Sequence, residues 1–304
     1  MPMIHRPGSP FSRTLIPGFY DYLSTSHRDH PSELLQVAPS TYYAGHSREA
    51  SLREQHDAVL KAEILRVHEE NHGVYGVRKV WRALPREGWT VGRDRVGRLM
   101  RSLGLKGVIR GDHKRRTTVP QPAGERPQDL VRRQFRAVAP NRLWLADLTY
   151  VWTDQGFVYT AFITDAFSRR IVGWKVSRSL SVEVALDALE MAIWGRCQER
   201  LEGLVHHSDR GSQYLAVRYT ERLAEVGAVT SVGSKGDSYD NALAETVHGL
   251  YKAELIHRRE HWSGRAEVEL ETAQWVAWWN TARLHSACGY LPPAEYERRH
   301  REAA

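Results

Sequence analysis

The pattern of apolar residues changes once along this chain, from helical to strand-like, and the change falls at Pro140. Beyond it, the segments 143–152, 157–164 and 171–176 are rich in Trp, Tyr, Val, Ile and Thr. Short turn-like stretches, TDQG and DAFSRR, separate these segments. Consecutive β-rich segments joined by short turns predict an antiparallel meander of three strands.

Helical and strand-like segments alternate after this meander. The pattern predicts helices at 182–194 and 214–226, short strands at 203–207 and 229–232, and two further helices after Asn241 and Gly264. Three strands followed by alternating helices and strands predict an α/β fold, in which helices flank a mixed sheet.

The region before the meander predicts a small all-α domain over residues 57–105. One helix runs from Asp57 toward Gly73, a second spans 76–84 before Pro85, and a third spans 93–103. The third helix is rich in arginine, with Arg93, Arg95, Arg98 and Arg101 largely away from its apolar face. Three such helices indicate a helix-turn-helix-like DNA-binding domain, and a small helical bundle with a solvated basic face is the open alternative.

Composition divides the remainder of the chain into four further segments. Residues 1–56, rich in Pro, Ser, His and Tyr, predict a partly ordered arm, and residues 106–139 a basic, Pro-rich linker. We expect the mixed α/β core at 140–256 and a helical extension at 257–304. The extension carries Trp275, Trp278 and Trp279 at helical spacing, which favours packing in a core over stacking on DNA.

Charge and composition narrow the class of protein. The 304 residues carry a formal net charge of +7, and the stretch 86–116, with ten basic and three acidic residues, holds an equal excess. This distribution suits a polyanionic partner. The chain has no apolar run long enough to span a membrane and no secretory signal, which indicates the cytoplasm. Two cysteines, Cys197 and Cys288, form no zinc motif and are expected to be buried free thiols.

Three acidic residues lie at positions that could form a functional site. Asp147 lies inside the apolar segment LWLADLTYVW, and Asp209 follows a short strand at its exit into a loop. Glu245 lies on a predicted helix whose apolar face carries Leu243, Val247 and Leu250. The opposite stripe of this helix carries Asn241, Glu245, His248 and Lys252.

Each acid taken alone also has an ordinary structural explanation. Asp147 could face solvent or pair with Arg142, Asp209 could be a turn aspartate, and Glu245 could lie on a solvated helix face. Taken together, oxygens from two strands and a helix suggest a site for two magnesium ions that leaves room for phosphate oxygens.

Several blocks in one order give the chain a specific resemblance. They are PNRLWLADLTYV, FVYTAFITDAFSRRIVGW, HSDRGSQY, SKGDSYDNALAET and WNTARLHSACGYLPPAEYE. From Pro140 to about Glu297 the chain resembles the transposases of bacterial insertion sequences encoded by two overlapping reading frames, which are related to retroviral integrases. The segments PSTYYA and YGVRKVWRALPREG resemble the helical DNA-binding region that precedes the core in that family.

The resemblance implies an RNase H-like core and a DDE-type polynucleotidyl transferase that cleaves DNA at insertion-sequence ends and joins it to a target. It places Asp147, Asp209 and Glu245 at the catalytic and metal-binding positions, with two Mg²⁺ ions for which Mn²⁺ can substitute. Lys252 and Asn241 are expected to contact DNA, and Asp165 to form a turn. The implied partners are DNA, further copies of the chain on DNA, and the first-frame product of the same element.

Two other functions stay open from the sequence. A catalytically silent DNA-binding regulator derived from a transposase is one, although all three acids and Lys252 are present. An RNase H-like nuclease that hydrolyses DNA without joining it is the other.

Overall fold

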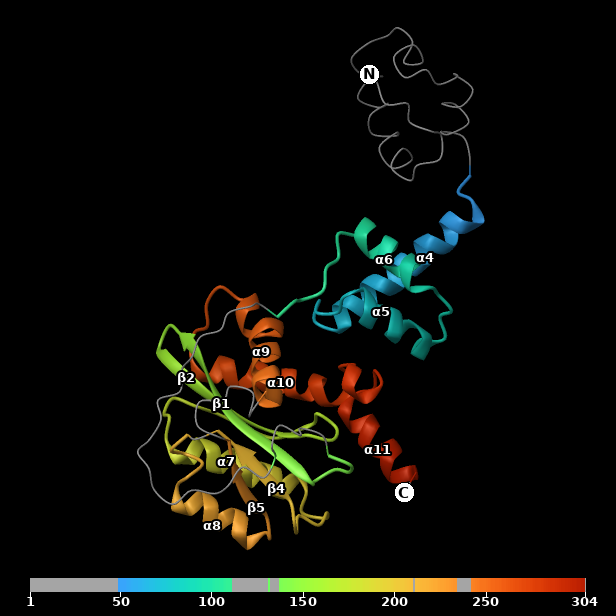
Figure 1. Cartoon of the computed structure of the whole chain (residues 1–304). Helices are drawn as coiled ribbons and strands as arrows, with labels where there is room; N and C mark the ends of the chain where they lie inside the picture. The colour runs from blue at the N-terminus through green and yellow to red at the C-terminus, as the bar shows by residue number, and fades with distance from the viewer. Residues whose placement is uncertain (1–48, 111–130, 132–136, 210, 234–241, 304) are drawn as a thin grey trace, which may run out of the picture. The chain divides into compact units, whose positions relative to one another are not determined.

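The computed structural model divides the chain into two compact units, Met1–Val59 and Leu60–Ala304. The structure describes residues 49–110, 131, 137–209, 211–233 and 242–303 (Figure 1). Most of the predicted arm at 1–56 and of the predicted linker at 106–139 therefore lies outside the described residues. The boundaries expected from composition stay predictions.

Helix α4 (Leu52–Glu70) begins before the predicted start at Asp57. The carboxylate of Glu54 accepts hydrogen bonds from the backbone nitrogen and the hydroxyl of Ser51, at 2.8 and 2.7 Å. The Glu54 nitrogen donates to the Ser51 hydroxyl at 3.3 Å. This reciprocal pair is a capping box, which satisfies amide groups that the first turn leaves unpaired.

Two short helices follow, α5 (Val77–Ala83) and α6 (Arg93–Ser102), with the 3₁₀ turn η1 (Leu84–Glu87) between them. Their positions match the predicted segments 76–84 and 93–103. Pro85 ends α5 by starting η1. The helices bury apolar side chains that include Leu60, Ile64, Val80, Leu84, Val96 and Leu99, and these belong to a larger apolar cluster that extends into the α/β region.

Five strands form one mixed sheet in the order β3-β2-β1-β4-β5 (Figure 1). The strands are β1 (Leu143–Thr153), β2 (Gly156–Asp165), β3 (Ile171–Ser177), β4 (Val205–Ser208) and β5 (Val229–Val232). The first three form the predicted antiparallel meander, while β4 and β5 run parallel to β1. The mixed α/β fold expected from the sequence is therefore confirmed.

Helices cover both faces of this sheet. One face packs on α7 (Val182–Gly195) and α8 (Val217–Glu225), through a cluster that includes Trp144, Ala188 and Tyr219. The other face packs on α9 (Ala242–Glu254) and α10 (Arg265–Thr281), through Val151, Phe162, Val247, Tyr251 and Trp275. In Figure 1, α7 and α8 lie on one side of the sheet and α9 and α10 on the other.

Helix α7 approaches β3 closely at Gly173. A Cβ atom at Gly173 would lie 2.0 Å from the Ala188 carbonyl oxygen and 2.9 Å from the Ala192 Cβ. Glycine at this position therefore lets the helix backbone rest directly on the strand.

The C-terminal region packs as predicted and adds an unpredicted helix. Trp275, Trp278 and Trp279 are buried, which confirms packing rather than exposure for stacking. After the 3₁₀ turn η3 (Ser286–Cys288), helix α11 (Pro293–Ala303) follows, which the sequence pattern did not predict.

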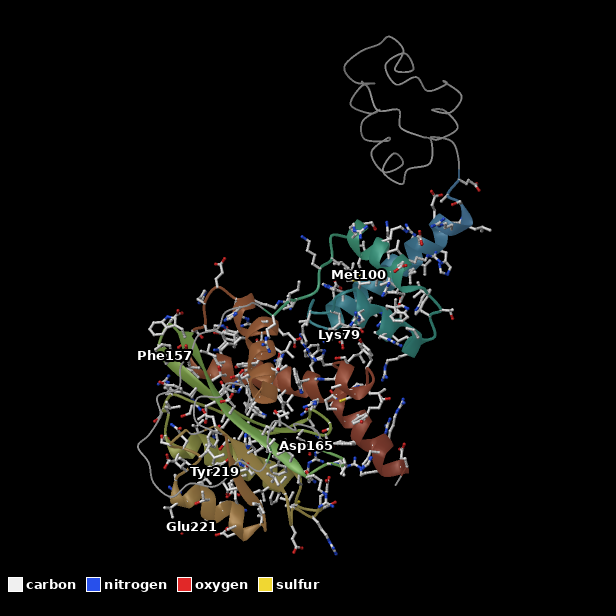
Figure 2. The ribbon with its side chains drawn as sticks, in the orientation of Figure 1. Lys79, Met100, Phe157, Asp165, Tyr219 and Glu221 are labelled. Carbon is white, nitrogen blue, oxygen red and sulfur yellow. The ribbon has the colours of Figure 1, made fainter. Side chains whose placement is uncertain are left out.

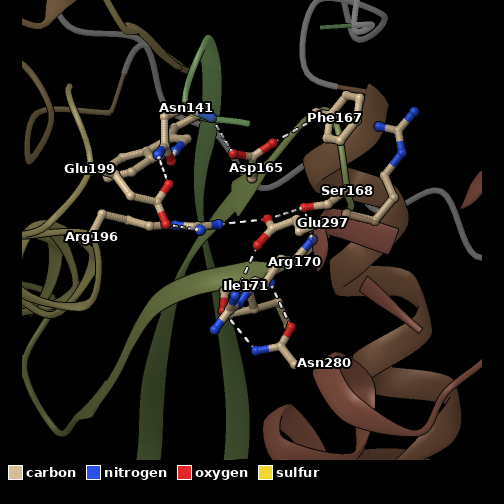
Figure 3. Close-up of polar contacts among 12 residues, drawn as sticks. Asn141, Asp165, Phe167, Ser168, Arg170, Ile171, Arg196, Glu199, Asn280 and Glu297 are labelled. Atoms are coloured by element: carbon tan, nitrogen blue, oxygen red, sulfur yellow. Dashed lines mark hydrogen bonds and ion pairs between the residues drawn. The ribbon is translucent and has the colours of Figure 1, made fainter. Parts of the chain in front are cut away.

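Helix α11 is held to the sheet by a buried carboxylate (Figure 3). Glu297 accepts hydrogen bonds from Ser168 at 2.7 Å, Arg196 at 2.6 Å and Arg170 at 2.9 Å. Burial would raise the pKa of Glu297, but its hydrogen bonds to Arg196 and Ser168 and the charges of Arg196 and Arg170 hold that pKa below its ordinary value. Two arginines thus compensate one buried acid.

Asp165 forms the predicted turn and a second connection. Its carboxylate accepts a hydrogen bond from the Phe167 nitrogen at 2.8 Å within the turn, and one from the Asn141 nitrogen at 2.7 Å just before β1. The carboxylate therefore ties the end of β2 to the start of β1 (Figure 3).

The helical region and the C-terminal region of the second unit share side-chain contacts. The Tyr75 hydroxyl donates to the Ala282 carbonyl oxygen at 3.3 Å and accepts from the Leu284 nitrogen at 2.7 Å. The Trp278 indole donates to the Asn71 side-chain oxygen at 3.1 Å.

One cysteine expectation was wrong. Cys288 is buried, as expected, but Cys197 is exposed, because it lies in the turn that ends α7 rather than on the packed face of that helix. Among the described residues, no helix combines the length and the apolar character needed to cross a membrane.

Candidate active site

The register of two parallel strands brings Asp147 and Asp209 together. The last register pair between β1 and β4 joins Ala146 to Ser208. Asp147 and Asp209 are the residues that follow this pair along the chain. Neighbouring strands lie about 4.8 Å apart, so the two carboxylates start from adjacent backbones at one end of β4.

Electrostatics show the same proximity. Burial and the nearby charge of Asp147 raise the pKa of Asp209 to about 6, although a hydrogen bond from the Gly211 nitrogen and the charge of His248 oppose this rise. The Gly211 nitrogen donates to Asp209 Oδ1 at 2.9 Å, which fixes the carboxylate at the strand exit. The two negative charges repel each other, which disfavours ionisation of Asp209.

Helix α9 lies over Asp147 and Asp209. Its buried face differs from the apolar face that the sequence predicts. Ala244, Val247, His248 and Tyr251 are buried, while Leu243 and Leu250 are half-buried. His248, which the sequence pattern placed on the polar stripe opposite the apolar face, is therefore on the buried side of the helix. Ala244 and Tyr251, which the predicted apolar face left out, pull the buried side of the helix toward His248.

His248, to which the sequence pattern assigned no role, is the α9 side chain that contacts the acidic pair. Its Nδ1 lies 3.0 Å from Asp147 Oδ2, and the imidazole is mostly buried. His248 Nε2 has no hydrogen-bond partner among the described residues. The sequence did hold one indication of this contact, because His248 lies one helical turn after Glu245.

Glu245 lies at the edge of the same cluster and is exposed. Partial loss of solvent around its carboxyl group and the charge of Asp147 raise the pKa of Glu245, whereas the charges of Arg110 and His248 oppose that rise. Strand register thus places Asp147 beside Asp209, and the effect of the Asp147 charge on the pKa of Glu245 shows that Glu245 lies near Asp147.

Arg110 reaches this helix from beyond the helical region, and the sequence pattern assigned it no role. Its guanidinium Nη1 lies 3.4 Å from the Thr246 hydroxyl. A Cβ atom at Gly249 would lie 2.6 Å from Arg110 Cδ, so the glycine provides room for the arginine. This places a cation beside Glu245.

Lys252 lies two turns after Glu245 on the same helix. Its ammonium group is 4.6 Å from the centre of the Tyr150 ring, a cation–π contact with β1. Burial lowers the pKa of Lys252, and the charge of Asp147 opposes this effect. The lysine is therefore held between the acidic cluster and an aromatic side chain.

The three carboxylates are of the type that binds magnesium, but they are not arranged closely enough to form a metal site. Within the part of the chain that the structure describes, no group of three acidic, histidine or cysteine side chains is close enough to hold a metal ion. Asp147, Asp209 and Glu245 nevertheless offer carboxylate oxygens, and the charge of Asp147 raises the pKa of both Asp209 and Glu245. A divalent cation would relieve this repulsion, so the residues fit magnesium by type and charge.

The expected DNA contacts fall into two groups. Arg93, Arg98 and Arg101 are exposed on α6, and Arg95 is half-buried there. Arg93 pairs with Asp94 at 3.2 Å. Asn241 lies outside the described residues.

Family models match almost all of the described chain. An HTH-like domain matches residues 54–113, and two models of an integrase core domain match residues 137–238 and 227–293. The simian T-cell lymphotropic virus intasome, solved in complex with the PP2A regulatory subunit B56 gamma, shares 14% identity at a TM-score of 0.45. The match covers 77% of this chain and 74% of that one.

Two relatives match over nearly their whole lengths. The putative transposase for insertion sequence element IS986/IS6110 of Mycobacterium tuberculosis is 54% identical over 278 residues, which cover 89% of this chain and 100% of the relative. The transposase for insertion sequence element IS629 of Shigella sonnei is 55% identical over 269 residues, covering 87% of this chain and 89% of that protein.

An integrase core behind a helix-turn-helix-like domain defines a DDE-type polynucleotidyl transferase. The chain belongs to the family of insertion-sequence transposases.

Proposed function

We propose that Asp147, Asp209 and Glu245 form the catalytic triad and hold two Mg²⁺ ions, or Mn²⁺ in their place, for cleavage and strand transfer at the ends of an insertion sequence. The adjacency of Asp147 and Asp209 in the register of β1 and β4 carries this proposal. When bound, the metal ions would supply positive charge that favours attack on phosphorus and departure of the 3′ oxygen.

The side chains of this protein position the DNA and the carboxylates. His248 orients Asp147 through its contact with Oδ2. Lys252 binds a phosphate or a base next to the scissile bond. Attack by water on phosphorus breaks the bond to the 3′ oxygen and leaves a free 3′-hydroxyl. Attack by that hydroxyl on a second phosphodiester joins the two DNA strands and releases a new 3′-hydroxyl.

The helix-turn-helix-like domain would hold the transposon end through Arg93, Arg95, Arg98 and Arg101. Exposed arginines on a helix suit phosphate contacts and base readout in the major groove. We further propose that several copies assemble on DNA in the bacterial cytoplasm, with the first-frame product of the element as an additional partner.

A gel assay tests the catalytic assignment. The probe is labelled duplex carrying the element's terminal inverted repeat, incubated with the full chain and Mg²⁺. Joined products indicate a transposase, nicked products alone a hydrolytic nuclease, and shifted but intact DNA a silent regulator. We expect Asp209→Asn to abolish nicking and joining while DNA binding persists. Asp187→Asn, an exposed acid on α7 paired with Lys175, is the matched control. Nicking by the Asp209→Asn protein would refute the assignment.

A further inference from the structure

The ends of β1 and β2 carry partly exposed aromatic side chains on one face of the sheet. Along both strands the side chains alternate, so that Val151, Thr153, Val158 and Thr160 are buried. The opposite face carries Tyr150, Trp152, Phe157 and Tyr159, which we call the aromatic face. A solvated sheet face normally carries polar side chains.

The register makes this face continuous. Trp152 pairs with Phe157, and Tyr150 pairs with Tyr159, across the two strands. The Phe157 ring lies 4.8 Å from the Trp152 ring and 5.4 Å from the Tyr150 ring, centre to centre, and both pairs meet edge to face. Trp152 is 66% exposed and Phe157 47% exposed. Figure 2 shows Phe157 at the end of the sheet opposite to Asp165.

Charge and position identify what this face would bind. Asp147 falls on the same side of β1 as Val151 and contacts α9, so it lies on the face of the sheet opposite to the aromatic face. Lys252 on α9 nevertheless places its ammonium group 4.6 Å from the centre of the Tyr150 ring. The exposed acid at this end, Asp154, has His261 within 3.4 Å. Aromatic rings beside a cation suit a nucleobase and its phosphate, since bases stack on aromatic side chains regardless of sequence.

We propose that the aromatic face and Lys252 form a stacking site for unpaired bases of DNA. This inference rests on the proposed function, because it takes the substrate to be the DNA end held at Asp147 and Asp209. Between β1 and β4 the register pairs stop at Ala146, so the Tyr150 end of β1 lies beyond the part that β4 pairs with.

Binding without divalent metal tests the inference apart from catalysis. The probes are a short labelled duplex with an unpaired 3′ tail and the blunt duplex of the same sequence. We expect the wild-type chain to prefer the tailed duplex, and Trp152→Ala combined with Phe157→Ala to lose about tenfold or more in affinity for it while binding blunt duplex unchanged. Trp152→Phe should keep the preference, because its ring still stacks.

Two controls make the result specific. Trp194→Ala removes a tryptophan that is 80% exposed on α7, away from the aromatic face, and should leave both affinities unchanged. A 5-iodouracil in the tail should photo-crosslink to residues 150–159 of the wild-type chain. Equal tail preference in the double variant would overturn the inference. A change in the DNA-free oligomeric state without a change in tail preference would also overturn it, by making this face an interface between copies.

Failure of the inference is distinguishable from failure of the proposed function. The Asp209→Asn chain should keep the tail preference although it no longer cleaves. A wild-type chain that cleaves with Mg²⁺ but shows no tail preference contradicts the stacking site alone. A wild-type chain that prefers the tail but never cleaves contradicts the proposed function alone.

Discussion

The imidazole of His248 on α9 lies against the carboxylate of Asp147 on β1, with Nδ1 3.0 Å from Oδ2. This contact joins the helix that carries Glu245 to the strand that carries the first acid of the proposed triad. Under the proposed function, this contact would make His248 a positioning residue that acts through Asp147.

Replacing His248 should change the response to magnesium more than the binding of DNA. We expect His248→Gln to raise the Mg²⁺ concentration needed for half-maximal cleavage by about 10- to 100-fold, because partners of a metal-ligating carboxylate set its orientation. DNA affinity without metal should be unchanged. His261→Gln removes an exposed histidine that also faces a carboxylate, and it should leave the metal response unaltered. An unchanged metal response in the His248→Gln chain would show that the contact is only structural.

The arginines of α6 should govern how steeply DNA binding depends on salt. Removing one phosphate contact lowers the slope of log affinity against log salt concentration by about 0.9. We expect Arg98→Gln and Arg101→Gln each to reduce the slope by about that amount in anisotropy titrations, since both side chains are exposed. Arg298→Gln, on an exposed arginine of α11, is the control. If either variant has the same salt-dependence slope as the wild type, that arginine does not contact a DNA phosphate.

The buried ion pair between Glu254 and Arg283 should dominate stability in the C-terminal region. Arg283 Nη2 lies 2.5 Å from Glu254 Oε1, and both side chains are buried. We expect Glu254→Gln to lower the free energy of unfolding by about 3–5 kcal/mol, because it leaves a buried guanidinium uncompensated. Glu302→Gln, in an exposed pair with Arg298, should cost less than about 1 kcal/mol. Urea unfolding measures both, and equal losses would contradict this assignment.

Glu297 should make part of the stability depend on acid pH. Its pKa in the folded chain lies below the ordinary value, so its contribution is present above the unfolded-state pKa and is lost as the pH falls through the folded-state pKa. We expect unfolding midpoints of the wild type to fall below about pH 4.3, the unperturbed glutamate pKa. Glu297→Gln should be less stable at neutral pH and lose less on acidification. A parallel decline in both chains would assign the acid sensitivity to other groups.

Gly173 should tolerate no side chain. The Cβ of Gly173→Ala would meet the Ala188 carbonyl oxygen at 2.0 Å, so α7 must shift away from β3. We expect a loss of about 1–3 kcal/mol in the free energy of unfolding, as for other overpacked cores. Gly195→Ala, at the end of α7, has the Val172 oxygen as its nearest neighbour at 3.9 Å and should be neutral. Calorimetric melting temperatures compare the two.

The sheet and part of the site could be predicted from the sequence for a clear physical reason. Strand-forming residues between short turns define the meander, and an acid at the end of a short strand after it lies beside Asp147 once β4 pairs in parallel. These features depend on local patterns, which the sequence shows directly.

The burial of His248 and the existence of α11 could not be predicted in that way. The buried side of α9 depends on Tyr251 fitting against Phe162 and Trp275, which are contacts between distant segments. The sequence of helix α11 is mostly polar. Its fully buried acid, Glu297, is stabilised by Arg196 at the end of α7 and by Ser168 and Arg170 in the β2–β3 turn, which are distant in the sequence.

Because β1 and β4 pair in parallel, the distance between Asp147 and Asp209 in space does not depend on the number of residues between them in the sequence. β2, β3 and α7 all lie between Asp147 and Asp209 in the sequence. The gap between the two acids is nevertheless set by a single interstrand distance. Loops in that intervening stretch are therefore free to lengthen or shorten over evolutionary time without disturbing the chemistry, whereas a one-residue slip of β4 would disrupt it.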